Sequence, residues 1–130
     1  MQIIGGPVII EDVSLCFNSL KGLPGPYIKS FVEKLGRQGL CNILNGFEDR
    51  SAYAMCIYAY CHSSTSKPQL FKGICHGQIL KSPRGESKFG WDPIFQPDGY
   101  KQTFAEMDPE LKNEFSHRAL ALKELSVFLN

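Results

Sequence analysis

The chain has 130 residues, of which 43% are hydrophobic and 21% charged, a composition typical of one globular domain with its own core. Its 14 basic and 13 acidic residues give a formal net charge of +1. A broad nucleic-acid or membrane surface needs an excess of one sign, so this balance argues against a nucleic-acid polymer or a membrane as partner. We expect a single domain over residues 1–130, in which a local cluster of bases holds any anionic ligand.

Five cysteines, an odd number without a CxxC motif, are typical of a reduced intracellular protein. Cys61-His62 and Cys75-His76 are adjacent pairs, but neighbours in a strand point to opposite faces, which argues against a zinc site. Residues 1–6 carry neither the basic nor the apolar region of a signal peptide. We therefore expect a cytoplasmic protein.

The first apolar run, Pro7–Ile10, is rich in β-branched residues and predicts a buried strand. It is followed by Glu11 and Asp12, which we expect at the carboxyl end of that strand, where ligands tend to bind in open α/β sheets. Two adjacent carboxylates can hold Mg²⁺, and one can act as a general base on water. The alternative is a pair of solvated acids that open a loop.

A turn rich in glycine and proline spans Lys21–Lys29 and leads into a helix that begins near Tyr27. Gly36 and Gly39 should interrupt this helix and leave a second short one. Lys29 lies in the first turn, where a cation opposes the helix dipole and a bound phosphate would offset the cost. A surface lysine is the alternative.

The almost wholly apolar run Ala52–Cys61 predicts a long central strand covered on both faces. After a Ser/Thr turn, Gln69–Leu80 predicts a second strand, broken at Gly73 and Gly77. The two strands should form a hairpin.

A charged and flexible loop is expected over Lys81–Lys88, ahead of the aromatic stretch Phe89–Pro97. Aromatic faces favour flat heterocycles, Asp92 can accept hydrogen bonds from ring N–H groups, and Gly90 permits a close backbone approach or a positive φ. This pattern predicts a loop that grips a nucleobase. The alternative is a proline-bent turn whose aromatic side chains fill the core.

The last quarter of the chain begins with a turn at Asp98-Gly99 and a possible short strand at Thr103–Ala105. Asp108 followed by proline predicts the start of a short helix that carries Lys112. Ser116 is a suitable N-cap for the final helix.

His117 and Arg118 fall in the first turn of that final helix, where cations are unfavourable without an anionic or acceptor partner. Residues placed against local preference are candidates for function. An exposed His and Arg on a solvated face is the alternative.

Taken in order, these motifs closely resemble the inosine triphosphate pyrophosphatases, and the resemblance runs essentially from Gly6 to the C-terminus. It implies an α/β fold, with a mixed twisted β-sheet and flanking helices. The motifs are Glu11-Asp12, Gly22–Pro26, Phe89–Pro93, Lys112-Asn113 and Ser116–Arg118.

The resemblance implies hydrolysis of ITP, dITP and XTP to the nucleoside monophosphate and pyrophosphate. It also implies Mg²⁺ as cofactor, with Mn²⁺ as a possible substitute, and a homodimer. Phe89 would stack on the base, with Gly90 in the same motif and with Trp91 and Asp92 completing the pocket.

By the same resemblance, His117 and Arg118 would contact the 6-keto edge of the purine. An arginine donor suits a purine O6 and rejects the amine of adenine, because donor would face donor. Lys112 and Lys29 would meet the polar and phosphate groups of the ligand.

At the other end of the site, Asp12 would hold the metal and orient or activate the attacking water, with Glu11 beside it. Asp12 and Lys112 would be the catalytic residues. Val13 takes a substrate-binding position where the family has Thr or Ser, so a hydroxyl that could bond the ligand is absent.

The family also has a strand, a Thr-Gly-Asn loop and a helix with a phosphate-binding Lys, followed by a metal-binding Glu, ahead of the part matched here. We expect this chain to lack that strand-loop-helix unit and to leave an unpaired sheet edge. Three hypotheses follow: a pyrophosphatase, weakened or rescued by a partner chain; a non-catalytic isoform or remnant that binds purine nucleotide or dimerises with a full-length relative; and a truncated product that does not fold stably.

Overall fold

A computed structural model describes residues 7–62, 67–86 and 90–130; the stretch 87–89, and with it Phe89, lies outside the described residues. In the described part, one sheet has the strand order β2-β1-β3-β4-β5, and its neighbouring strands pair antiparallel. The strands are β1 Val8–Phe17, β2 Pro24–Gly25, β3 Ser51–Cys61, β4 Gln69–Ile79 and β5 Phe95–Pro97. The helices are α1 Ile28–Ile43, α2 Pro109–Phe115 and α3 His117–Leu129, with short 3₁₀ turns at Asn18–Leu20, Leu44–Gly46 and Asp92–Ile94.

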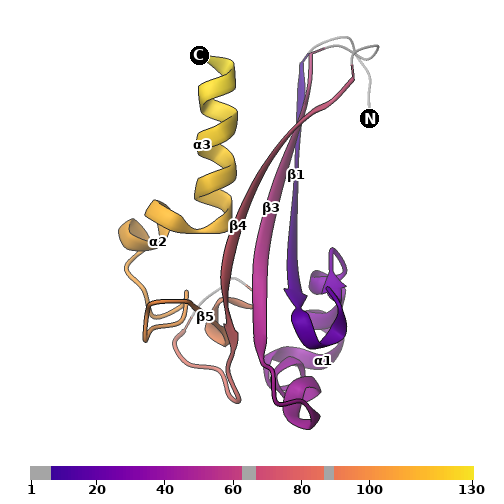
Figure 1. The fold of residues 1–130 in the computed structure, drawn as a ribbon, viewed down its shortest axis with the longest axis vertical. Helices are drawn as coiled ribbons and strands as arrows, with labels where there is room; N and C mark the ends of the chain where they lie inside the picture. Colours follow the sequence, from indigo (N-terminus) through magenta and orange to yellow (C-terminus); the bar gives the residue numbers. More distant parts are fainter. Residues whose placement is uncertain (1–6, 63–66, 87–89) are drawn as a thin grey trace.

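Three long strands, β1, β3 and β4, form the body of the molecule (Figure 1). Helix α3 runs alongside β4, while α1 lies near the end of β1 at the bottom of the view. The α/β fold with flanking helices is therefore confirmed. Among the described residues, no helix is long and apolar enough to cross a membrane.

The central strand β3 has two different faces. Ala52, Ala54 and Cys56 are buried, whereas the residues between them are half-buried. This alternation follows from the two-residue period of a strand. We call the buried side the core face. The predicted hairpin of β3 with β4 is confirmed, with Cys56 opposite Gly73.

Strand β1 differs from the prediction, because it does not end before Glu11 and Asp12 but continues to Phe17. Val13, Leu15 and Phe17 continue the two-residue apolar period of a strand beyond Asp12, and Leu15 and Phe17 are fully buried on the core face. The run Pro7–Ile10, which was predicted to be buried, lies at the exposed end of β1, and residues 9–12 are all exposed. Along Val8–Ser14, β3 is the only described strand that pairs with β1, as expected for an open sheet edge.

Strand β4 also corrects a prediction, because Gly73 and Gly77 do not break it. A Cβ on Gly73 would collide with the carbonyl oxygen of His117, and one on Gly77 would collide with that of Gln96. Glycine is needed here so that α3 and β5 can approach the strand closely. The position of α3, and thus of its first turn, depends on Gly73.

The helices begin and end largely as the sequence indicates. Gly36 has a left-handed φ of 73° and kinks α1, while Gly39 lies within its second segment without interrupting it. Asp108 and Ser116 cap α2 and α3, accepting hydrogen bonds from the amides of Glu110 and Ala119 at 3.1 Å each.

Residues 103–105 form part of a turn rather than the expected strand. The buried Thr103 accepts a hydrogen bond from the amide of Glu106, which curls the backbone back on itself. The turn at Asp98-Gly99 is confirmed, with Gly99 at a φ of 87°.

Candidate functional site

An aromatic cluster lies beneath the start of α3. The ring of Trp91 is 5.3 Å from that of His117 and 5.7 Å from that of Phe95. The ring of Phe104 lies 5.9 Å from that of His117 and 6.2 Å from that of Trp91, so the three rings of Trp91, Phe104 and His117 form a triangle. Trp91 is 9% exposed and Phe95 is fully buried, so these two side chains fill the core. Their burial agrees with the alternative interpretation, a proline-bent turn whose aromatic side chains fill the core.

His117 is buried, so the alternative of an exposed histidine on a solvated face is wrong for this residue. Burial first, then the charges of Arg118 and Lys112, lower the pKa of His117 to about 3, so its ring is neutral at physiological pH. Its Nδ1 is buried and has no hydrogen-bond partner among the described residues. A neutral ring at the first turn of α3 avoids the dipole penalty that a cation would incur there.

Asp92 and Lys112 form an ion pair at the edge of the same cluster. The Lys112 Nζ donates to the Asp92 Oδ2 at 2.6 Å, and it also lies 5.0 Å from the centre of the Phe104 ring. The pair is largely shielded, with side chains 22% and 10% exposed. Two predicted site residues from separate motifs are thereby brought together.

Arg118 is paired with Glu11 across the core face of the sheet. Its Nε donates to the Glu11 Oε2 at 3.0 Å and its Nη2 to the Oε1 at 3.3 Å. The hydroxyl of Tyr58 donates to the same Oε2 at 2.7 Å. Burial and this hydrogen bond raise the pKa of Tyr58, so the hydroxyl keeps the proton that it donates.

Asp12 is exposed and, as the neighbour of Glu11 in a strand, points to the opposite side of the sheet. Val13 returns to the core face opposite Cys56, where it packs against the hydrophobic core. Lys29 is exposed in the first turn of α1, as predicted. The adjacent Glu11 and Asp12 are therefore divided between the two faces.

One of the two expected reasons for a glycine at position 90, a positive φ, is wrong. Its φ is not in the left-handed region, and an added Cβ would meet Val32 at 3.6 Å, an ordinary contact. Its carbonyl accepts a 2.7 Å hydrogen bond from the Nε of Arg37, which ties the aromatic stretch to α1.

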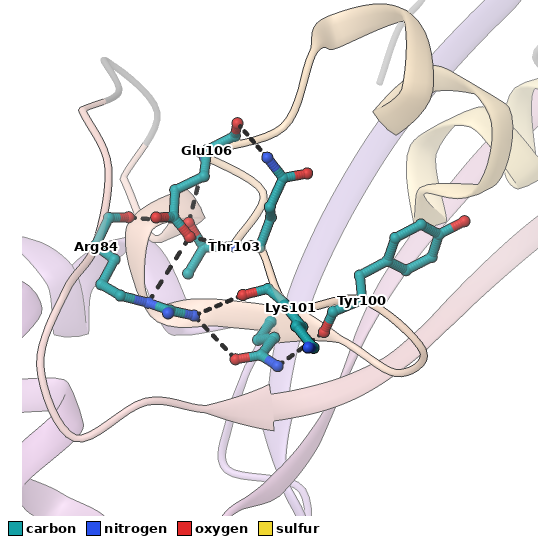
Figure 2. A network of polar contacts seen from close by, with 7 residues as sticks. Arg84, Tyr100, Lys101, Thr103 and Glu106 are labelled. Atoms are coloured by element: carbon teal, nitrogen blue, oxygen red, sulfur yellow. Dashed lines mark hydrogen bonds and ion pairs between the residues drawn. The ribbon is translucent and has the colours of Figure 1, made fainter.

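Arg84 organises the loop that precedes the aromatic stretch (Figure 2). Its Nη2 donates to the Gln96 Oε1 at 3.0 Å and to the Lys101 carbonyl at 2.9 Å, and its Nε lies 3.7 Å from the Glu106 carboxylate. Its own carbonyl accepts a 2.9 Å hydrogen bond from the Thr103 hydroxyl. The loop expected to be flexible is thus fixed at Arg84.

Three contributors were missed from the sequence: Tyr58, Phe104 and Arg84. Tyr58 belongs to an apolar strand pattern, and its role depends on lying directly opposite Glu11 in the sheet. An arginine between Pro83 and Gly85 in a charged loop was the one available signal for an anchored loop.

A metal ion has limited support from the side chains in the described residues. No group of three or more His, Cys, Asp or Glu residues there could hold one. Asp12 offers one exposed carboxylate, which suits Mg²⁺ with water as its remaining ligands. Glu11 does not fit beside it, because both of its oxygens are engaged on the other face.

The fold and these side chains define an α/β protein in which two ion pairs, Glu11–Arg118 and Asp92–Lys112, lie near the first turn of the last helix. A model of the Ham1 family matches residues 1–128. The chain belongs to the Ham1 family. This confirms the family expected from the motifs.

Solved structures agree with that assignment. The chain is similar to a HAM1 protein from Coxiella burnetii, with 32% identity and a TM-score of 0.88 over 95% of this chain and 67% of that one. A Ham1 protein from Staphylococcus aureus matches with 31% identity and a TM-score of 0.81, over 95% of this chain and 67% of that one. A nucleoside-triphosphatase (dITP/XTP pyrophosphatase) from Mycobacterium abscessus matches with 29% identity and a TM-score of 0.76, over 96% of this chain and 67% of that one.

Proposed function

We propose that this chain acts as a nucleoside-triphosphate pyrophosphatase. It hydrolyses ITP, dITP and XTP to the nucleoside monophosphate and pyrophosphate. Membership of the Ham1 family and the likeness to a dITP/XTP pyrophosphatase support the reaction class. The observation that carries the proposal is the arrangement at the start of α3, where Arg118 and His117 lie beside the ion pair of Asp92 and Lys112.

In this proposal the base end of the site selects a 6-oxopurine. Phe89 stacks on the base, and Trp91 and Asp92 of the same motif complete the pocket. Arg118 donates to the purine O6, with His117 beside it, and an adenine amine is rejected because two donors would meet. The exposed guanidinium supports this assignment, because half of the Arg118 side chain is open to solvent.

The phosphate end of the site uses Lys112, Lys29 and Asp12. The two lysines neutralise charge on the ligand, which is the main task of a protein in phosphoryl transfer. Asp12 lies on the other face of the sheet at the open edge of β1, so it would meet the phosphates around that edge, hold Mg²⁺, or Mn²⁺ in its place, and orient the attacking water. When bound, such an ion neutralises phosphate charge and lowers the pKa of water. Val13 brings no hydroxyl to this end.

The proposed setting is a cytoplasmic homodimer. Cys16, Cys41, Cys56 and Cys75 are free and buried, which supports a reducing compartment. Light scattering on the purified chain tests the dimer: a mass near twice 14.6 kDa is expected, and a monomer at micromolar concentration would contradict it.

The experiment that tests the function measures pyrophosphate release from ITP and from ATP with Mg²⁺. Release from ITP is expected to exceed release from ATP, and Lys29→Ala should slow it while Lys34→Ala does not. Both lysines are exposed on α1, so the pair is a matched control. Equal release from ITP and ATP would contradict the base assignment.

A non-catalytic nucleotide-binding role is the second candidate. It is favoured by the described residues, among which no group of three or more His, Cys, Asp or Glu side chains could hold a metal ion. Binding of ITP without release of pyrophosphate would identify this role.

A further inference from the structure

The side chains of Glu11 and Arg118 meet although 107 positions separate them in the sequence. Both the Nε and an Nη of the guanidinium donate to the carboxylate, at 3.0 and 3.3 Å. A two-point contact of this kind fixes the plane of the guanidinium as well as its position. Arg118 is therefore oriented before any ligand arrives.

The Glu11 carboxylate is itself held in place from the neighbouring strand. Tyr58 lies directly opposite Glu11 in the β1–β3 pairing and donates to it at 2.7 Å. The first turn of α3 lies close enough to the sheet for Arg118 to contact Glu11, because Gly73 on β4 has no side chain that would hold the helix away. Three strands and one helix thus cooperate to set the direction of one arginine.

Structural stability alone does not account for this arrangement. The side chains are 50% and 36% exposed, and ion pairs open to solvent contribute little to folding. Glu11 uses two of the five guanidinium N–H groups, and half of the Arg118 side chain is open to solvent. The geometry is that of a donor held ready for an acceptor.

The neighbouring carboxylate is placed for a different task. Asp12 follows Glu11 in the strand and so points to the opposite side of the sheet, exposed to solvent. One metal ion cannot take both carboxylates while Glu11 remains bonded to Arg118.

We propose that Glu11 is a positioning residue for purine selection, which holds Arg118 toward the 6-oxo group, and that Asp12 alone of the two serves the metal. This inference rests on the proposed function and assigns Glu11 away from the metal. Removing the charge of Glu11 should free Arg118 and reduce discrimination between 6-oxo and 6-amino purines.

The test measures binding of IMP and AMP by isothermal titration without added metal, so that neither turnover nor Mg²⁺ enters the result. The wild-type chain should prefer IMP, and Glu11→Gln should reduce the ratio of the two affinities by about tenfold. Asp12→Asn is the matched control and should keep the ratio within about twofold. Both variants should melt within about 4 °C of the wild type, since the exposed pair adds little stability.

A second experiment measures Mn²⁺ binding by electron paramagnetic resonance and distinguishes the role of Asp12 from that of Glu11. Asp12→Asn should weaken Mn²⁺ binding and Glu11→Gln should leave it unchanged. The inference is overturned if the wild type prefers IMP and Glu11→Gln keeps that preference, or if Glu11→Gln weakens Mn²⁺ binding as Asp12→Asn does. A wild-type chain without any preference for IMP would instead overturn the proposed function, and this inference with it.

Discussion

Replacing Gly73 with alanine is the sharpest test of how the site is built. The added Cβ would collide with the His117 carbonyl oxygen and lie 2.5 Å from the backbone nitrogen of Ala121. An ordinary contact begins near 3.4 Å, so relieving the Ala121 contact alone requires α3 to retreat from β4 by about 0.9 Å, and the tighter His117 contact requires more. Both obstacles are backbone atoms of one helix, which cannot move aside as a side chain could.

The expected cost is about 3 kcal/mol of unfolding free energy, at the upper end for overpacking a core, because the retreat loosens the buried Ala121 and Leu125. Gly46→Ala is the control: nothing lies within 4 Å of its added Cβ, and a change within about 0.5 kcal/mol is expected. Urea unfolding can be followed by fluorescence of Trp91, the one tryptophan, which is buried against His117. A Gly73→Ala chain as stable as the Gly46→Ala chain would refute the reasoning.

Three further predictions concern the cluster below α3. The pKa of His117 is about 3 in the folded chain and about 6.5 in the unfolded chain, so between these pH values the unfolded chain binds more protons and the folded state loses stability as pH drops. About 3 kcal/mol of unfolding free energy should be lost by pH 4. Urea unfolding of His117→Gln at several pH values should show a shallower loss than the wild type, and parallel curves for the two chains would contradict the prediction. Lys112→Met should lower the free energy of unfolding by about 3 kcal/mol, measured by thermal unfolding, because it leaves the shielded Asp92 carboxylate without its cation. Adding Asp92→Asn to this variant should recover part of the loss. If the losses of the two single variants simply add in the double variant, the pair is not coupled. Thr103→Val should cost about 1–3 kcal/mol by urea unfolding, because the Arg84 carbonyl loses the Thr103 hydroxyl, and an unchanged midpoint would argue against that bond.

The sequence was informative wherever local chemistry decides the structure. Apolar runs and a polar turn predicted the β3–β4 hairpin, and the N-caps Asp108 and Ser116 fixed the starts of α2 and α3. Gly36 marked the kink in α1 because its backbone adopts a left-handed φ that other residues avoid. These features depend on a few neighbouring residues.

The features that the sequence did not predict depend on contacts between distant elements. Gly73 reads as a strand breaker until α3 is seen against it. The neutral, buried state of His117 requires Trp91 and Phe104 to pack against it, and Glu11 acquires its role only when α3 brings Arg118 to β1. No local pattern contains this information.

Of the candidate site, the residues themselves were named from the sequence, but their pairing was not. Asp92 and Lys112 come from separate motifs and meet in space, whereas the adjacent Glu11 and Asp12 separate onto two faces. Which residues act together therefore depends on the register and the face of the sheet on which each side chain lies, and less on adjacency in the sequence.

The central claim is that ITP is cleaved between its α- and β-phosphates. The direct measurement is ³¹P nuclear magnetic resonance of the chain incubated with ITP and Mg²⁺, with the Lys112→Met variant beside it. The account predicts IMP and pyrophosphate as products, formed more slowly or not at all by the variant. Formation of IDP and orthophosphate, or turnover that the variant fully retains, would contradict it.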